Sequence, residues 1–221
     1  MKYVISVLRQ ARGSEERYVE SFDYESGSGE TTLLQALLDI NEKHGANIAF
    51  EYSCCQKKCG ACSARVNNRP KLLCHARLKD YGGKILIEPL RKFPIVEDLI
   101  VDRSILQENL KKLELWLRKP ARQSSGELSF RSSSCVQCGL CLEACPNFDG
   151  KSLYFGPSSI APIAKIALEG DEETKAKLKK AYQEHIYKGC GRSLACVNVC
   201  PRKIPIDELL VNLNGLSIWK K

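Results

Sequence analysis

The chain has 221 residues, of which 43% are hydrophobic and 27% charged, so it can bury a core and is not expected to be disordered. Its formal net charge is +8, and no apolar run approaches the about 20 residues of a membrane span. The N-terminal stretch has no apolar core followed by a cleavage site, so we expect a soluble, cytoplasmic protein. No basic patch is interleaved with aromatic residues, which argues against a nucleic-acid partner.

Twelve cysteines lie in three groups along the chain. They make up about 5% of the residues, which is below the ~8–10% of a disulfide scaffold. In a reducing cytosol, cysteines grouped at metal-type spacing indicate metal binding and not disulfide bonds. Because ligation deprotonates cysteine, much of the positive charge would offset negatively charged clusters.

The first half of the chain predicts a β-grasp pattern, in which two strands and a helix precede further short strands. Either Thr31 or Thr32 can cap the helix, and its leucine and isoleucine residues form one apolar stripe. The order of these elements would be weak evidence on its own. In chain order, the expected elements are strands at 2–9 and 17–24, a helix over 33–43, and strands at 63–66, 71–76 and 84–90.

The loop before the third expected strand reads CCQKKCGAC. Cys54, Cys59 and Cys62 stand at spacings four and two, and Cys74 follows, which is the plant-type arrangement of [2Fe–2S] ligands. Cys55 would leave only three residues before the next cysteine, so we expect it not to be a ligand. The alternative is that Cys55 replaces Cys54.

The middle of the chain is predicted to connect two domains. Residues 91–95 are typical of a linker, and a helical pattern then runs over 97–118 until Pro120 stops it. Residues 119–134 are polar and serine-rich, so we expect a surface loop there.

Residues 135–146 read CVQCGLCLEACP, which is the bacterial-ferredoxin spacing for iron–sulfur ligation. In that arrangement the first three thiolates bind one cluster, and the fourth binds a different cluster. A second copy should therefore exist, and residues 190–201 read CGRSLACVNVCP. Its one mismatch is Ser193, which stands where the pattern requires cysteine.

Exchange of the fourth thiolate between the two copies gives one complete set and one set of three. The complete set suits a [4Fe–4S] cluster and consists of Cys135, Cys138, Cys141 and Cys200. The set with a vacant corner suits a [3Fe–4S] cluster and consists of Cys145, Cys190 and Cys196. Ser193 could instead supply an oxygen ligand to a fourth iron. Zinc often uses CxxC pairs, but it does not explain a second copy that is broken at one corner.

The C-terminal part predicts a short apolar helix near 157–168, a charged helix over 171–187 and an amphipathic helix over 206–213. The expected fold class is therefore α+β. A β-grasp [2Fe–2S] ferredoxin domain over 1–93 would be followed by an all-helical domain over 94–221, with both ferredoxin-type cluster loops at its centre.

These motifs together resemble the iron–sulfur subunit of the succinate dehydrogenase/fumarate reductase family. Residues 94–104, PIVEDLIVDRS, are also similar to the family's linker helix. The resemblance implies an FAD-containing partner that interconverts succinate and fumarate, and a membrane anchor that handles quinone at the cytoplasmic face. Electrons would pass from FAD through [2Fe–2S], [4Fe–4S] and [3Fe–4S] clusters to quinone, or in reverse. No catalytic residue is expected on this chain.

One departure from the family pattern concerns the quinone. Members that reduce ubiquinone carry tryptophans soon after the cysteine that matches Cys145, and a histidine after the one that matches Cys190. Here residues 146–150 read PNFDG, and Gly191 follows the second cysteine. We therefore expect a menaquinone-linked fumarate reductase. The alternatives are a partner flavoprotein that reduces another unsaturated acid, and a thiol or other soluble electron donor. A free-standing ferredoxin-like carrier would need neither two domains nor three clusters.

Overall fold

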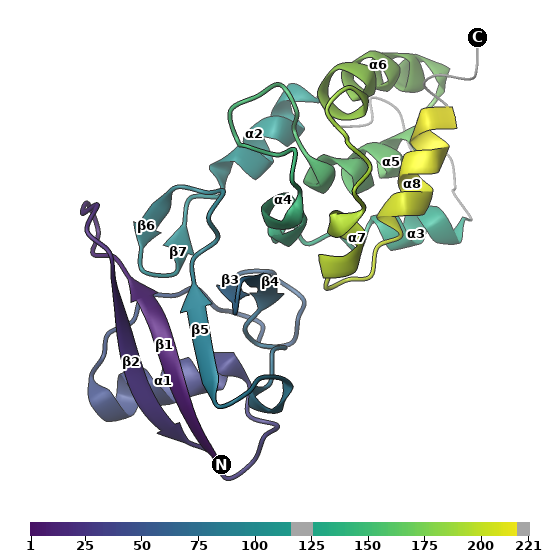
Figure 1. Ribbon diagram of the computed structural model, residues 1–221. Helices are drawn as coiled ribbons and strands as arrows, with labels where there is room; N and C mark the ends of the chain where they lie inside the picture. Colours follow the sequence, from purple (N-terminus) through teal and green to yellow (C-terminus); the bar gives the residue numbers. More distant parts are fainter. Residues whose placement is uncertain (116–125, 216–221) are drawn as a thin grey trace. The chain divides into compact units, whose positions relative to one another are not determined.

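A computed structural model describes residues 1–115 and 126–215. The chain divides into two compact units, Met1–Asp102 and Arg103–Lys221 (Figure 1). No helix in these described stretches is long and apolar enough to cross a membrane.

The first unit contains a five-stranded sheet in the order β2-β1-β5-β3-β4, with α1 lying across it (Figure 1). β1 pairs antiparallel with β2 and parallel with β5, which is the arrangement of a β-grasp fold. The elements are β1 (Lys2–Arg9), β2 (Tyr18–Glu25), α1 (Leu33–His44), β3 (Ser63–Val66), β4 (Arg69–Leu72), the short 3-10 helix η1 (Leu78–Asp80), β5 (Lys84–Glu88), β6 (Ile95–Glu97) and β7 (Ile100–Val101).

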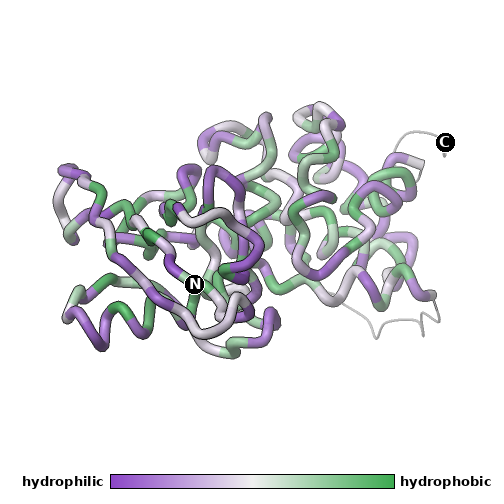
Figure 2. Tube along the Cα trace, turned by 60° about the horizontal axis from the view of Figure 1, so that its bottom comes forward, coloured by the Kyte–Doolittle hydropathy of each residue, from purple (hydrophilic) through white to green (hydrophobic). Residues whose placement is uncertain are grey.

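Helix α1 follows the sequence prediction closely. Thr32 caps it by accepting a hydrogen bond from the backbone amide of Gln35, and Gly45 ends it in the left-handed conformation. Its apolar stripe is buried, with Leu33 and Leu37 fully inaccessible. Buried and less buried residues alternate along β1. Hydrophobic and hydrophilic residues are interspersed along the chain (Figure 2).

The fourth strand begins earlier than the sequence pattern indicates. The expected strand at 71–76 is β4, which ends at Leu72. The reason is the tight turn at Asn67 and Asn68, which both have positive φ and pair Val66 with Arg69. The strand therefore ends before Cys74, and this cysteine lies in the turn that follows.

The expected helix at 97–118 is wrong in its first part. Ile95–Val101 forms the antiparallel hairpin β6–β7, and helix α2 begins only at Ser104. The expected linker helix over 94–104 is therefore also wrong. Residues 116–118 of the expected helix, with Pro120, lie outside the described residues.

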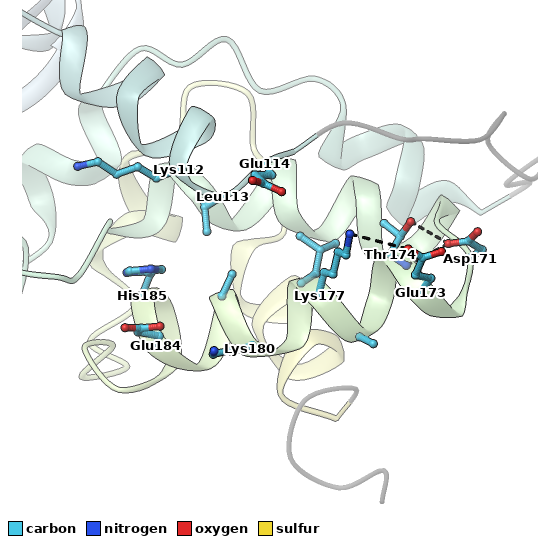
Figure 3. Close-up of a pocket in the computed structure, with 13 residues that line it drawn as sticks. Lys112, Leu113, Glu114, Asp171, Glu173, Thr174, Lys177, Lys180, Glu184 and His185 are labelled. Atoms are coloured by element: carbon cyan, nitrogen blue, oxygen red, sulfur yellow. Dashed lines mark hydrogen bonds and ion pairs between the residues drawn. The ribbon is translucent and has the colours of Figure 1, made fainter.

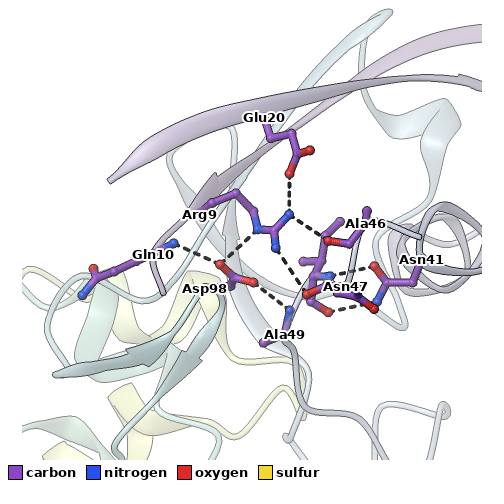
Figure 4. Close-up of polar contacts among 9 residues, drawn as sticks. Arg9, Gln10, Glu20, Asn41, Ala46, Asn47, Ala49 and Asp98 are labelled. Atoms are coloured by element: carbon purple, nitrogen blue, oxygen red, sulfur yellow. Dashed lines mark hydrogen bonds and ion pairs between the residues drawn. The ribbon is translucent and has the colours of Figure 1, made fainter. Parts of the chain in front are cut away.

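The buried carboxylate of Asp98 connects this hairpin to the rest of the first unit (Figure 4). The carboxylate of Asp98 accepts hydrogen bonds from the backbone amides of Gln10, at 3.0 Å, and Ala49, at 2.8 Å. It also pairs with the guanidinium of Arg9 at 3.0 Å, and Arg9 contacts Glu20 as well. The expected domain boundary at residues 93 and 94 stays a prediction, but these contacts explain why the first compact unit extends to residue 102.

Asp98→Ala should lower the free energy of unfolding by about 3 kcal/mol, because it leaves a buried guanidinium without one of its partners. Native-state hydrogen exchange should show faster exchange at the amides of Gln10 and Ala49, which lose their acceptor. Asp23→Ala is the matched control, since Asp23 is exposed on β2. Equal exchange rates in the two variants would contradict this account of the hairpin.

The second unit is helical over its described residues, and α5 lies at its centre. Ile160 and Ile163 of α5 are fully buried against Ile186 and Leu209. The elements are α2 (Ser104–Lys112), α3 (Glu127–Ser132), α4 (Leu140–Ala144), the 3-10 helix η2 (Pro157–Ser159), α5 (Ile160–Glu169), α6 (Glu172–Tyr182), the π-helix η3 (Gln183–Tyr187), α7 (Ala195–Val199) and α8 (Ile206–Asn214).

The expected loop over 119–134 contains a helix in its described part, because residues 127–132 form α3. Two of the serines that suggested a loop face inward. Ser129 donates to the carboxylate of Glu169 at 2.8 Å, and Ser132 donates to a backbone carbonyl at 2.7 Å. These bonds satisfy the hydroxyls inside the unit. Residues 119–125 lie outside the described residues.

Candidate metal centres

The cysteine loop of the first unit directs backbone amides at one sulfur. The Sγ of Cys54 accepts hydrogen bonds from the amides of Gln56 at 3.4 Å, Lys58 at 3.2 Å and Cys59 at 3.3 Å. These amides, those of Gln56 and Lys58 first, lower the pKa of Cys54 to about 7. Because the thiolate is the form that binds metal, the loop is suited to hold a ligand at this position.

Left-handed residues give this loop its shape. Cys55, Lys57 and Gly60 have φ values of +52°, +62° and +78°. The amide of Lys57 consequently reaches the Sγ of Cys74 at 3.3 Å, although the two residues lie far apart in sequence. Amides that point at sulfur in this way stabilise a negatively charged cluster.

The two neighbouring cysteines of the loop behave differently. The thiol of Cys55 is exposed and lies 3.6 Å from the carbonyl of Ser53, to which it donates. The Sγ of Cys54 instead accepts hydrogen bonds from backbone amides. This contrast supports Cys54 as the ligand, although the assignment stays a prediction.

The remaining thiols of the first unit lie close to one another. The amide of Cys74 contacts the Sγ of Cys62 at 3.5 Å. Burial raises the pKa of Cys62 to about 12, and the neighbouring thiols of Cys74 and Cys59 contribute to the increase. A cluster that binds here would have to displace this proton. The donor set of four sulfurs with surrounding amides fits a [2Fe–2S] cluster.

The second unit brings the thiols of the predicted complete set together across its two cysteine motifs. Burial raises the pKa of Cys135, and the nearby thiol of Cys200 adds to the effect. Burial also raises the pKa of Cys138 to about 11, again with contributions from Cys135 and Cys200. Burial raises the pKa of Cys141 well above its usual value, and the thiols of Cys138, Cys135 and Cys200 are among those that add to the effect. The last cysteine of the second motif thus lies with the first three of the first motif.

The predicted three-thiol set is brought together in the same way. Burial raises the pKa of Cys196 to about 11, and the nearby thiols of Cys145 and Cys190 contribute to the increase. The hydroxyl of Tyr154 lies 3.8 Å from the Sγ of Cys145. Burial and both of these thiols raise the pKa of Tyr154. No motif or spacing pointed to this tyrosine. Ser193, at the mismatched position, is exposed.

The two motifs share a backbone conformation as well as a spacing. Gln137 and Gly139 have positive φ in the first motif, and Arg192 and Leu194 have positive φ at the matching positions of the second. In each motif the second of these residues directly precedes a short helix, and the two helices, α4 and α7, pack on each other. Two buried thiol sets between paired loops fit two iron–sulfur clusters, with four and three protein ligands.

The three histidines lie in separate places. The Nε2 of His75 is 3.3 Å from the Nζ of Lys57, and burial followed by Lys57 lowers the pKa of this histidine. His44 is the last residue of α1. The ring of His185 stacks on Phe155 at 4.0 Å. In the described part of the chain, no three His, Cys, Asp or Glu side chains are placed to hold a single metal ion.

A cavity of about 920 Å³ lies in the second unit between the end of α2 and the helices α6 and η3 (Figure 3). Charged groups of both signs line it, including Lys112, Glu173 and Lys177. None of the predicted cluster cysteines lines this cavity. The chemistry predicted from the sequence is therefore located elsewhere, at the thiol sets.

Thiol sets that accept hydrogen bonds from amides, on a β-grasp unit and a helical unit, define the class of iron–sulfur electron-transfer proteins. Comparison with known families agrees. Residues 4–108 match the 2Fe-2S iron-sulfur cluster binding domain, and residues 131–204 match the 4Fe-4S dicluster domain.

Individual relatives make the family more specific. The succinate dehydrogenase iron-sulfur subunit of Bacillus subtilis is 33% identical over 184 residues, which cover 76% of this chain and 71% of that protein. The fumarate reductase iron-sulfur subunit of Haemophilus influenzae is 32% identical over 197 residues, covering 79% and 77%. This chain belongs to the succinate dehydrogenase/fumarate reductase iron–sulfur subunit family. It is an electron-transfer subunit of an oxidoreductase, with [2Fe–2S], [4Fe–4S] and [3Fe–4S] clusters as cofactors.

Two further comparisons concern fold and length. A chain of the Mycobacterium smegmatis Sdh1 complex in the apo form has a TM-score of 0.83 at 24% identity and covers 100% of this chain and 97% of that one. At this identity the likeness shows the fold alone. A subunit of the fumarate reductase (CoM/CoB) of Methanothermobacter marburgensis is 30% identical over 211 residues, which are 91% of this chain. The chain spans only 41% of that longer relative.

Substituting the two adjacent cysteines separately tests the ligand assignment in the first unit. Cys54→Ser should lose most of the [2Fe–2S] absorption and the corresponding iron, because a sulfur ligand surrounded by amides is removed. Cys55→Ser is the matched control and should keep both. Visible circular dichroism and iron analysis of the two variants measure the difference. Loss of the cluster in the Cys55 variant alone would show that the ligand is Cys55.

Introducing a thiol at the mismatched position tests the three-thiol set. Ser193→Cys should convert part of the three-iron cluster to a four-iron cluster, because it supplies the thiolate that the motif lacks. Electron paramagnetic resonance of the oxidised protein should show a weaker three-iron signal. Ser133→Cys, at an exposed position outside both motifs, is the control. An unchanged three-iron signal in the Ser193 variant would contradict the vacant-corner interpretation.

Proposed function

We propose that this chain relays electrons between an FAD-containing catalytic partner and a quinone bound at a membrane anchor, as part of a fumarate reductase or succinate dehydrogenase. The observation that carries this proposal is that the two cysteine motifs of the second unit exchange their last cysteines, which gives two thiol sets. The first unit contains a third, separate set. Such a chain offers a series of redox centres, which is what a relay of electrons needs.

The proposal assigns three clusters to three thiol sets. The [2Fe–2S] cluster would bind Cys54, Cys59, Cys62 and Cys74. The [4Fe–4S] cluster would bind Cys135, Cys138, Cys141 and Cys200. The [3Fe–4S] cluster would bind Cys145, Cys190 and Cys196.

Each cluster, when bound, supplies one-electron transfer without proton chemistry of its own. The chain's residues provide the environment. Amides around Cys54 stabilise negative charge, and the cysteines of the two sets in the second unit are buried or half-buried. Oxidation of succinate or reduction of fumarate would take place on the partner, because these thiol sets offer no acid or base for that chemistry.

The electron partner is proposed to be menaquinone. Neither the tryptophans nor the histidine of ubiquinone-reducing relatives is present after Cys145 and Cys190. Instead, Phe148 is buried, and Tyr154 lies against the thiols. The complex would then sit at the cytoplasmic face of the membrane, with this chain attached through the anchor.

A second candidate function is favoured by one comparison. The Methanothermobacter relative matches 91% of this chain, and its name assigns it to a fumarate reductase (CoM/CoB) and mentions no quinone. A thiol or another soluble donor could therefore replace quinone here. A different unsaturated acid as the partner's substrate is the remaining alternative.

The complex should be purified anaerobically from native cells through a tag on this chain, then supplied with a reduced menaquinone analogue. We expect fumarate-dependent oxidation of the quinol. Fumarate reduction with an artificial dye but not with quinol would reject the quinone and favour a soluble donor. Inactivity with both, despite intact clusters and bound flavoprotein, would reject succinate and fumarate as the partner's substrates.

Cys59→Ala should abolish electron transfer through the chain, because the [2Fe–2S] cluster loses a ligand. Succinate should still bleach the flavin of the partner, since the chemistry takes place there. Stopped-flow absorption of the flavin and steady-state quinol oxidation measure the two steps separately. Full quinol-coupled activity in this variant would contradict the relay.

A further inference from the structure

Gln137 occupies an unusual position inside the first cysteine motif, between Cys135 and Cys138. Its side-chain Nε2 donates to the Sγ of Cys135 at 3.2 Å and to the backbone carbonyl of Ser158 at 3.2 Å. One amide group therefore connects a predicted [4Fe–4S] ligand to the neighbouring element η2.

The orientation of this amide is fixed by its second contact. A backbone carbonyl only accepts hydrogen bonds, so the NH₂ group of Gln137 and not its oxygen must face Ser158. Ser158 is itself 4% exposed. The same NH₂ group is consequently the one that faces the sulfur.

The other end of the amide carries a cost. The Oε1 atom of Gln137 is buried and has no hydrogen-bond partner in the described part of the chain. Leaving a buried acceptor of this kind without a partner destabilises the folded state. An apolar side chain of similar length would avoid that cost, but it would lose the hydrogen bonds to Ser158 and to Cys135. A redox or catalytic role is one explanation for a buried polar group that is left unsatisfied.

The second motif supplies an internal comparison. Arg192 stands at the matching position and has almost the same φ, +54° against +49°. The left-handed conformation therefore belongs to the loop and is not special to glutamine. The guanidinium of Arg192 is exposed and lies 5.9 Å from the ring centre of Tyr187. The hydrogen bond from a side-chain amide at this position to a cysteine sulfur therefore distinguishes the complete thiol set from the three-thiol set.

We propose that Gln137 is a positioning residue that raises the reduction potential of the [4Fe–4S] cluster by donating a hydrogen bond to its Cys135 ligand. This inference rests on the proposed cluster assignment. When the cluster accepts one electron, negative charge on its sulfurs increases, and a donor at the sulfur stabilises that reduced state. The electron therefore resides more readily on this cluster than it would without the amide.

The test uses Gln137→Met, which keeps the length of the side chain and removes both the donor and the orphaned oxygen. In the natively purified complex, a redox titration followed by electron paramagnetic resonance should give a lower [4Fe–4S] potential. The [2Fe–2S] potential should be unchanged and serves as an internal reference. Gln107→Leu, at an exposed position of α2, is the control for loss of an amide.

Two further readouts separate this role from a structural one. Proton electron–nuclear double resonance in H₂O and D₂O should show one exchangeable proton fewer near the reduced cluster. Thermal unfolding of the variant measures the effect of the lost hydrogen bond to Ser158 on stability, and a change in stability with an unchanged potential would identify a purely structural role. Gln137→Glu, whose carboxylate cannot donate, should also lower the potential and covers the case in which the methionine variant does not fold.

An unchanged [4Fe–4S] potential in both variants would overturn the proposal. A parallel shift of the [2Fe–2S] potential would also overturn it, because the effect would then be global. If the unmodified complex showed no [4Fe–4S] signal at all, the cluster assignment would fail, and that failure is visible before any variant is made.

Discussion

The whole structure depends on how negative charge is stabilised on cysteine sulfurs in a buried environment. Burial raises the pKa of Cys138 to about 11 and that of Cys62 to about 12, so an isolated thiol at these positions would stay protonated. Two devices oppose this effect. Left-handed loop residues turn amides toward the sulfurs, and a bound cluster shares the charge among several of them.

The rest of each unit holds those loops in place. In the first unit, the contact between Asp98 and Ala49 secures the segment that leads into the cysteine loop. In the second, the packing of α4 on α7 brings Cys200 to the thiols of the other motif. Each unit contains its thiol sets within itself, which suits a relay that must keep its centres fixed while electrons move.

Much of the fold and of the candidate ligand sets could be predicted from the sequence, because the spacing of cluster ligands is a strict constraint. The crossed grouping followed from the place of Cys145 and Cys200 in their motifs. Periodicity was less reliable, because the apolar residues of 95–101 fit a helix or a hairpin, and only the contacts of Asp98 favour the hairpin. The orientations of Gln137 and Tyr154 were not predictable, since spacing does not say which way a side chain between ligands points.

The most direct test of the account is electron paramagnetic resonance of the natively purified complex as it is reduced stepwise. The account predicts a three-iron signal in the oxidised state, followed on reduction by separate signals from a [2Fe–2S] and a [4Fe–4S] cluster. Two four-iron clusters with no three-iron signal would contradict the grouping of Cys145, Cys190 and Cys196 as a set with a vacant corner.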